Sequence, residues 1–230
     1  MKDYFDLAKK IPSIGNGGTS IPHQLQNAGA GIKENEIIVE TGSWFGSTTG
    51  FVMSGIKQTP FTPEYHCFDM WITYPHLVNQ AKKIGITLKD GQSILDIFKT
   101  NIKPFEIDPI IHQGDFIQQK FETDKKIGLV VDDICSKKPM FDHLLDLFIP
   151  FCYPGTLFFF MDFYFYTTHD VIRRKYQRDV MEKNQEAFEF IERPANSYTA
   201  IYRYKGGAVR KIRNPEYLKD WVDGEGNRVL

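Results

Sequence analysis

The sequence predicts an α/β fold: a seven-stranded, mostly parallel sheet with helices on both faces and a C-terminal antiparallel strand pair. Short apolar, β-branched runs alternate with segments of helical periodicity over residues 36–204, which is typical of a parallel sheet whose crossovers are helices. The last two strand-like runs, the second of which alternates, are the expected antiparallel pair. No repeat or interdomain linker interrupts 1–230, so we expect one domain, with an arm at 1–35 that either packs on the core or closes as a lid, a core at 36–204 and a tail at 205–230.

The individual elements follow from local patterns. The predicted strands are 37–40, 65–68, 109–112, 127–132, 156–161, 187–191 and 198–204. The predicted helices are 22–30, 47–57, 75–84, 90–102, 140–152 and 167–183, each with an apolar stripe or a cap signal at its start. Pro104 ends the helix at 90–102, and Pro154-Gly155 is expected to turn the chain into the fifth strand.

A glycine-rich turn follows the first strand. Glu40 ends that strand, Gly42 and Gly46 follow with Ser43 between them, and Ser47 opens a segment with helical spacing. Glycines let the backbone approach a ligand closely, and a helix start offers free N–H groups and the positive end of the helix dipole. This strand, turn and helix predict a cofactor site.

The first five strands each end in an acid. These residues are Glu40, Asp69, Asp115, Asp133 and Asp162. Ligands of parallel sheets bind outside the carboxyl ends of the strands. One acid after a strand is an ordinary turn residue, but five on one edge with glycines between them indicate a ligand site.

The acids after the second and third strands suit an adenosine. Asp69 can accept hydrogen bonds from both ribose hydroxyls, with Met70 and Trp71 flanking the adenine. Asp115, after Gly114, can accept from the adenine amino group while Phe116 packs on the ring; an ordinary turn at Gly114-Asp115 is the alternative. The glycine spacing E-x-G-x-x-x-G differs from the G-x-G-x-x-G pyrophosphate fingerprint, which disfavours NAD.

Five motifs in register resemble the class I S-adenosylmethionine-dependent methyltransferases, which have a Rossmann-like sheet, and most of all the macrocin-type sugar O-methyltransferases. The motifs are I-I-V-E-T-G-S-W-F-G-S-T, H-C-F-D-M-W, I-I-H-Q-G-D-F, I-G-L-V-V-D-D and Y-P-G-T-L-F-F-F-M-D-F. The resemblance implies S-adenosylmethionine as cofactor, O-methylation of a sugar or similar small acceptor, and cofactor contacts from Glu40, Gly42, Ser43, Gly46, Asp69 and Asp115.

The metal site of that family is altered in this chain. The resemblance implies magnesium held by paired acids at the ends of the fourth and fifth strands. Here the chain has Asp133-Ile134-Cys135 and Met161-Asp162-Phe163, so one acid of each pair is Cys or Met. Thiol and thioether are poor ligands for a hard cation. We therefore expect no metal, although Asp133 and Asp162 remain.

Transfer of a methyl group to oxygen or nitrogen needs a base for the acceptor proton. The expected catalytic residues are His169, Asp133 and Asp162, with His169 first because it follows the fifth strand; a surface or capping histidine is the alternative. Residues 163–166 either wall an acceptor pocket or pack in the core. The basic run 173–175 is either a solvated helix face or a clamp on a phosphorylated acceptor.

Composition limits the partners. The formal net charge is −1, which gives no basic surplus for nucleic acid, and no apolar run is long enough to span a membrane. Three scattered cysteines suit a reducing compartment, so a cytoplasmic protein is expected; a homo-oligomer is left open. Two other functions stay open: a catalytically silent protein of the same fold that acts in binding or assembly, and an NAD-dependent oxidoreductase.

Overall fold

The computed structural model describes residues 2–13, 19–134, 137–167 and 172–218. Within them, one sheet has the strand order β3-β2-β1-β4-β5-β7-β6. Neighbouring strands are parallel from β3 to β5, and β7 is antiparallel to both β5 and β6. The predicted fold class is confirmed. The strands are β1 Glu36–Thr41, β2 Tyr65–Asp69, β3 Ile110–Gln113, β4 Lys126–Asp132, β5 Cys152–Phe160, β6 Phe188–Glu192 and β7 Ala200–Tyr204.

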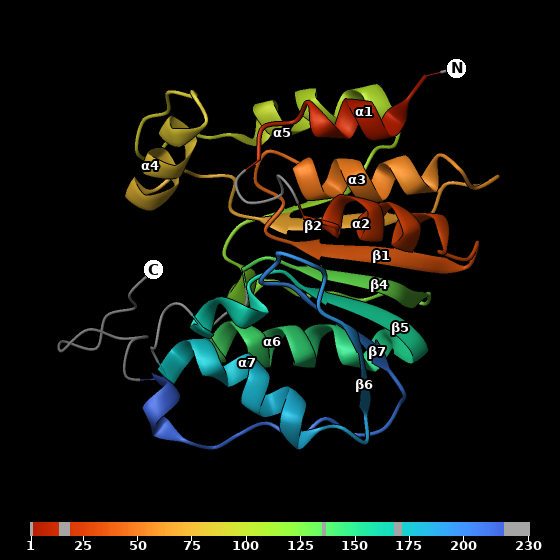
Figure 1. Ribbon diagram of the computed structural model, residues 1–230, viewed down its shortest axis with the longest axis vertical. Helices are drawn as coiled ribbons and strands as arrows, with labels where there is room; N and C mark the ends of the chain where they lie inside the picture. Colours follow the sequence, from red (N-terminus) through yellow and green to blue (C-terminus); the bar gives the residue numbers. More distant parts are fainter. Residues whose placement is uncertain (1, 14–18, 135–136, 168–171, 219–230) are drawn as a thin grey trace.

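Helices cover both faces of the sheet, as Figure 1 shows. Four of them (α1, α2, α3 and α5) lie on one face, while α6 and α7 lie on the other. Their bounds are α1 Tyr4–Lys9, α2 Ile21–Ala30, α3 Ser47–Ile56, α4 Pro75–Lys83, α5 Leu95–Ile102, α6 Lys138–Phe148 and α7 Ile172–Lys183. None of the helices in the described part combines the length and apolar character needed to cross a bilayer.

Helix α3 is the centre of the first helical layer. All ten of its residues are buried, because both α1 and α2 pack against it. Two glycines allow this: a Cβ on Gly29 would lie 2.1 Å from the carbonyl oxygen of Val52, and one on Gly55 would lie 1.9 Å from that of Gln26. The helix backbones therefore touch, and residues of 1–35 contribute to the larger core.

Several elements begin a few residues away from the predicted positions, and for β5 and α5 the structure shows the reason. Strand β5 begins at Cys152, so Pro154-Gly155 lies within it; the ladder to β4 shifts register there, which leaves room for a proline. Thr156 completes the irregular step by accepting from the Tyr153 N–H and donating to the Ile127 carbonyl. Helix α5 begins only at Leu95, because the preceding residues form a turn that bridges to Ile72.

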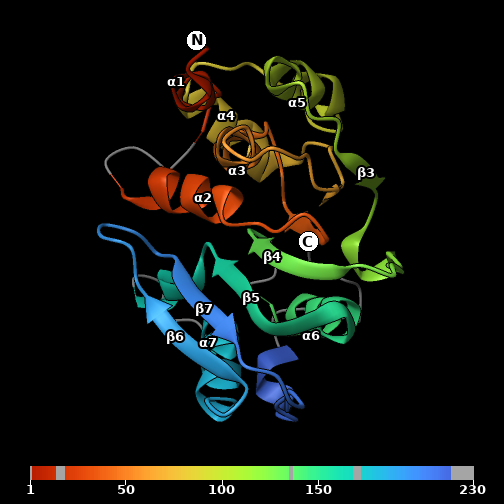
Figure 2. The same ribbon diagram turned by 90° about the vertical axis from the view of Figure 1, so that its right-hand side faces the viewer.

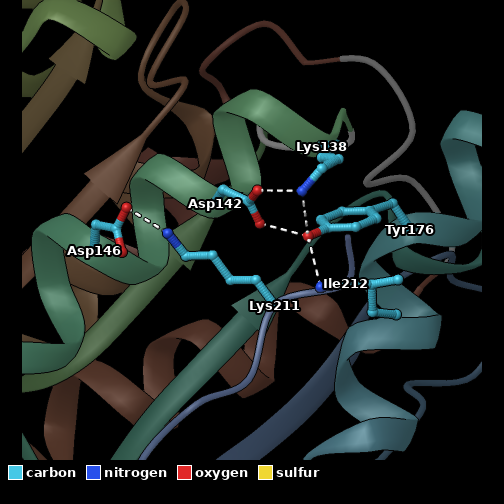
Figure 3. Close-up of polar contacts among 6 residues, drawn as sticks. All are labelled: Lys138, Asp142, Asp146, Tyr176, Lys211 and Ile212. Carbon is cyan, nitrogen blue, oxygen red and sulfur yellow. Dashed lines mark hydrogen bonds and ion pairs between the residues drawn. The ribbon is translucent and has the colours of Figure 1, made fainter. Parts of the chain in front are cut away.

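The C-terminal antiparallel pair extends the sheet beyond β5, at the end opposite β3 (Figure 2). The chain then returns along the second helical layer as a segment, residues 205–218, that we call the strap. Figure 3 shows two of its anchors: Lys211 pairs with Asp146 of α6, and the Ile212 N–H donates to the Tyr176 hydroxyl, which itself donates to Asp142. Tyr217, near the end of the strap, is buried and donates to Asp179.

Candidate active site

The strand order reverses between β1 and β4, which are neighbours at the centre of the sheet. In open α/β sheets this switch point forms the ligand crevice, at the carboxyl ends of the strands. The turns after β1, β2, β4 and β5 meet there, so the acids that end these strands come from segments far apart in the sequence.

The turn after β1 has left-handed backbone at both glycines and at Trp44, with φ of 83° at Gly42, 88° at Gly46 and 45° at Trp44. A Cβ on Gly42 would lie 2.5 Å from the Ile134 side chain, and one on Gly46 would lie 2.8 Å from that of Ile102. These glycines thus let the turn close onto the end of β4 and onto α5, which fixes the start of α3.

Glu40 lies beneath this turn and is fully buried. One of its oxygens accepts from the Tyr65 hydroxyl at 2.5 Å and from the Thr49 hydroxyl at 2.8 Å. Burial raises the pKa of Glu40 to about 7, and the two hydrogen bonds oppose that rise. At neutral pH this carboxyl exchanges between its charged and neutral forms.

Asp69 connects the turns after β1 and β2. It accepts from the Trp44 N–H at 2.9 Å on one oxygen and from the Trp71 N–H at 2.7 Å on the other. The Met70 N–H is a further backbone donor to this carboxylate, and because each oxygen has two lone-pair sites the carboxylate can still accept from a ligand hydroxyl. Burial raises the pKa of Asp69, and the backbone donors lower it.

Three buried oxygens around the turn have no hydrogen-bond partner among the described residues. They are Oε1 of Glu40, Oγ of Ser43 and Oγ of Ser47. Buried polar atoms in proteins are nearly always paired, so unpaired ones at a helix start indicate a place for ligand groups. The donors and acceptors here, with Asp69 beside them, fit the amino-acid and ribose groups of S-adenosylmethionine.

The ends of β4 and β5 bring Asp133 and Asp162 together. Both side chains are accessible to solvent, yet crowding by the surrounding protein raises the pKa of Asp133 well above its ordinary value, and the charge of Asp162 adds to the effect. Behind them, Asp132 is buried and accepts from the hydroxyl of Thr41 and the amide of Gln177. This network fixes the direction in which the two strands end.

The other residues expected at the site are placed as follows. The Trp71 ring is fully buried against Phe98, so its contribution to the Asp69 turn is its backbone N–H. Phe116 is buried and packs edge-on to Phe68. Asp115 caps a short 3₁₀ turn by accepting from the Ile117 N–H. Gly114 donates its N–H to the Asp69 carbonyl, and the Met70 carbonyl accepts from Gln113. His169 and Cys135 lie outside the described residues.

Several residues that position the site had no signal in the sequence. The Trp44 N–H donates to Asp69, and the Thr49 and Tyr65 hydroxyls donate to Glu40. Gln177 of α7 donates to Asp132. The contacts join strands and helices that are 9 to 45 residues apart. A spacing pattern finds the acids because they end strands, whereas their partners lie inside elements whose faces only the fold defines.

Comparison with solved structures identifies the fold. The O-methyltransferase NovP matches over 80% of this chain and 78% of its own, at 13% identity and a TM-score of 0.58. The calicheamicin methyltransferase CalS11 matches over 80% and 77%, at 15% identity and a TM-score of 0.53. An S-adenosylmethionine-dependent O-methyltransferase from Thermotoga maritima matches over 90% and 73%, at 12% identity and a TM-score of 0.53.

The protein therefore has the fold of the class I S-adenosylmethionine-dependent methyltransferases, as the strand-end motifs predicted. No protein family model and no curated protein matches the sequence. At these identities the solved structures define the fold alone.

Proposed function

We propose that this protein is an S-adenosylmethionine-dependent methyltransferase that methylates an oxygen of a small polar acceptor, such as a sugar hydroxyl. The observation that supports it most is the meeting of Glu40, Asp69 and the Asp133–Asp162 pair at one sheet edge, around a turn whose buried oxygens lack partners. CalS11, which has the same fold, is described as a TDP-rhamnose 3′-O-methyltransferase.

The carboxyl edge of the sheet has two parts: a cofactor half around Glu40 and Asp69, and an acceptor half around Asp133 and Asp162. In the cofactor half, Asp69 accepts from the ribose hydroxyls, while Ser43, Ser47 and the start of α3 hold the amino-acid end. Glu40 adds negative charge near the positive cofactor. When bound, the cofactor supplies an activated methyl group, so the chain has to align the acceptor and remove its proton.

The acceptor half provides the base. The pKa of Asp133 is raised by the surrounding protein and by the charge of Asp162. Once ionised, Asp133 is therefore a stronger proton acceptor than an ordinary carboxylate. His169, the first choice from the sequence, is the other candidate base because it follows β5. Asp133 takes the hydroxyl proton, and the negative charge of Asp162 stabilises the protonated form of that pair.

Calorimetric titration with S-adenosylmethionine, S-adenosylhomocysteine and NAD tests the cofactor. We expect the first two to bind and NAD not to bind. Asp69→Asn keeps the size of the side chain and removes the charge. It should lower the affinity for S-adenosylmethionine at least about tenfold. Asp96→Asn, in the first turn of α5, is the matched control. NAD binding, or unchanged affinity in the Asp69 variant, would contradict the proposal.

Turnover on a panel of hydroxylated acceptors tests the reaction, with formation of S-adenosylhomocysteine as the readout. Cofactor binding without turnover on any acceptor would favour the silent binding protein instead. Mass spectrometry of the purified protein adds an independent test, since retained S-adenosylhomocysteine would identify the cofactor class directly.

The cytoplasm is the compartment we propose, since Cys67 and Cys152 are free thiols.

A further inference from the structure

The loop between β6 and β7, residues 193–199, packs on the segment that follows β5. The Tyr164 N–H donates to the Tyr198 carbonyl at 2.8 Å, and the Phe165 ring meets the Tyr198 ring edge-on at 5.5 Å. Tyr164 is only two residues after Asp162, so this loop stands beside the acceptor half of the edge. The Tyr198 side chain is 39% exposed there.

Arg193 opens this loop and is held in place from two sides. Its guanidinium lies 4.2 Å from the centre of the Tyr164 ring, and its Nε donates to the Ser197 carbonyl at 3.0 Å. In the part of the chain that the structure describes, it makes no ion pair, and its two terminal nitrogens make no hydrogen bond. By contrast, Arg203 on the same hairpin is paired with Glu189 at 2.9 Å.

A guanidinium fixed in this way is preorganised for an oxyanion. Its terminal N–H groups form a planar fork that matches the two oxygens of a carboxylate or phosphate. Asp162, two residues before Tyr164, and the other strand-end acids repel an anionic acceptor, so such an acceptor needs a fixed cation close to the edge. Arg193 is placed to be that cation, and the exposed Tyr198 ring beside it offers a surface on which a ring can pack.

We propose that the acceptor carries an oxyanion, either a phosphate or a carboxylate, which Arg193 binds while Tyr198 packs against the acceptor's ring. This rests on the proposed methyltransferase function and names the class of its substrate. Arg193 is a binding residue here, so its loss should raise the KM for the acceptor and leave kcat nearly unchanged.

The direct test uses inorganic phosphate and acetate as separate probes, titrated at constant ionic strength into protein saturated with S-adenosylhomocysteine and followed by NMR. We expect one probe to bind, and Arg193→Gln to lower its affinity at least about tenfold. The affinity of Arg193→Lys should lie between those of the wild type and Arg193→Gln. The probe that binds more tightly distinguishes a phosphate ester from a carboxylate. Arg203→Gln, on the same hairpin, should change the affinity less than about twofold.

Two titration outcomes would overturn the proposal: neither probe binds the wild-type protein, or Arg193→Gln binds both as the wild type does. Turnover gives a second readout, with neutral sugars compared against sugar phosphates and uronic acids; an unchanged KM in Arg193→Gln for every accepted substrate would also overturn it. If S-adenosylhomocysteine does not bind at all, the proposed function fails, and titration of the probes without it still tests Arg193 separately.

Discussion

Glu40→Gln tests whether the buried acid at the end of β1 carries the unusual proton affinity that its surroundings imply. The side chain is fully buried, and one oxygen is satisfied by Tyr65 and Thr49 while the other has no partner among the described residues. Burial raises its pKa from 4.5 to about 7. Glutamine keeps the shape and an accepting oxygen but never ionises.

The sign follows from proton binding in the two states. Between pH 4.5 and pH 7 the folded protein holds a proton on Glu40 that the unfolded chain has lost, so the contribution to stability falls as the pH rises through this range. The shift from 4.5 to about 7 amounts to about 3 kcal/mol in full, of which about 2 kcal/mol lies between pH 5.5 and pH 8.

The wild-type pH profile alone does not isolate this effect. His112, which stacks on Phe68 and contacts His66, has its pKa lowered to about 4, by burial first and by His66 second. Its contribution to stability falls as the pH falls from 6.5 towards 4, opposite to that of Glu40. The two largely cancel, so the difference between variant and wild type is the informative quantity.

Urea unfolding of both proteins at pH 5.5 and pH 8 gives that difference directly. The free energy of unfolding of Glu40→Gln, relative to wild type, should be about 2 kcal/mol more favourable at pH 8 than at pH 5.5. Glu36→Gln, at a buried glutamate of the same strand that accepts from Tyr153 and the Lys33 N–H, reports what the same replacement does to β1 at each pH. A relative change below about 0.5 kcal/mol would refute the assignment of a raised pKa to Glu40.

Three further predictions concern the turn, the strap and the metal. Gly46→Ala should lower the free energy of unfolding by about 2 to 3 kcal/mol, because φ is 88° and the new Cβ meets the Ile102 side chain. Gly85→Ala, where φ is 78° but the space is open, should lower it by only about 1 kcal/mol. Equal losses for the two variants in urea unfolding would show that the contact with Ile102 does not matter. Tyr217→Phe should cost about 1 kcal/mol by losing its bond to Asp179, whereas the exposed Leu218→Ala should cost less than about 0.5 kcal/mol. A chelator should leave turnover unchanged, and a loss of activity that magnesium restores would disprove this.

The sequence was sufficient for the sheet and for the acids at its edge, because both follow from local chain chemistry. Buried parallel strands are continuous apolar runs, and the residue that ends each run must face the edge. Asp69 is therefore at the end of β2, and Glu40 is the last residue but one of β1, which runs one residue further than predicted. Strand β5 was expected to start after Pro154, because a proline suggests a turn and only the irregular ladder to β4 shows why the strand tolerates it.

The partners of these acids were not predictable in the same way. Thr49 reaches Glu40 because α3 lies across β1, and Gln177 reaches Asp132 because the second helical layer places α7 behind β4. Arg193 is 31 residues beyond Asp162 and comes near the acceptor half only through the β6–β7 hairpin. Such contacts depend on crossings between elements, and periodicity within one element carries no information about them.

The acceptor half has two neighbouring carboxylates, Asp133 and Asp162, at the position where the resemblance implies magnesium. Two carboxylates side by side require either a cation or a proton between them at neutral pH. Met161, which stands where an acid would complete the metal set, points into the core, where its sulfur contacts the Thr199 hydroxyl at 3.8 Å. The thioether therefore packs in the core, and the raised pKa of Asp133 reflects both its surroundings and the charge of Asp162. Under the proposed function, a proton shared by this pair takes the place that the resemblance assigns to magnesium, and its release leaves Asp133 as the base for the acceptor hydroxyl.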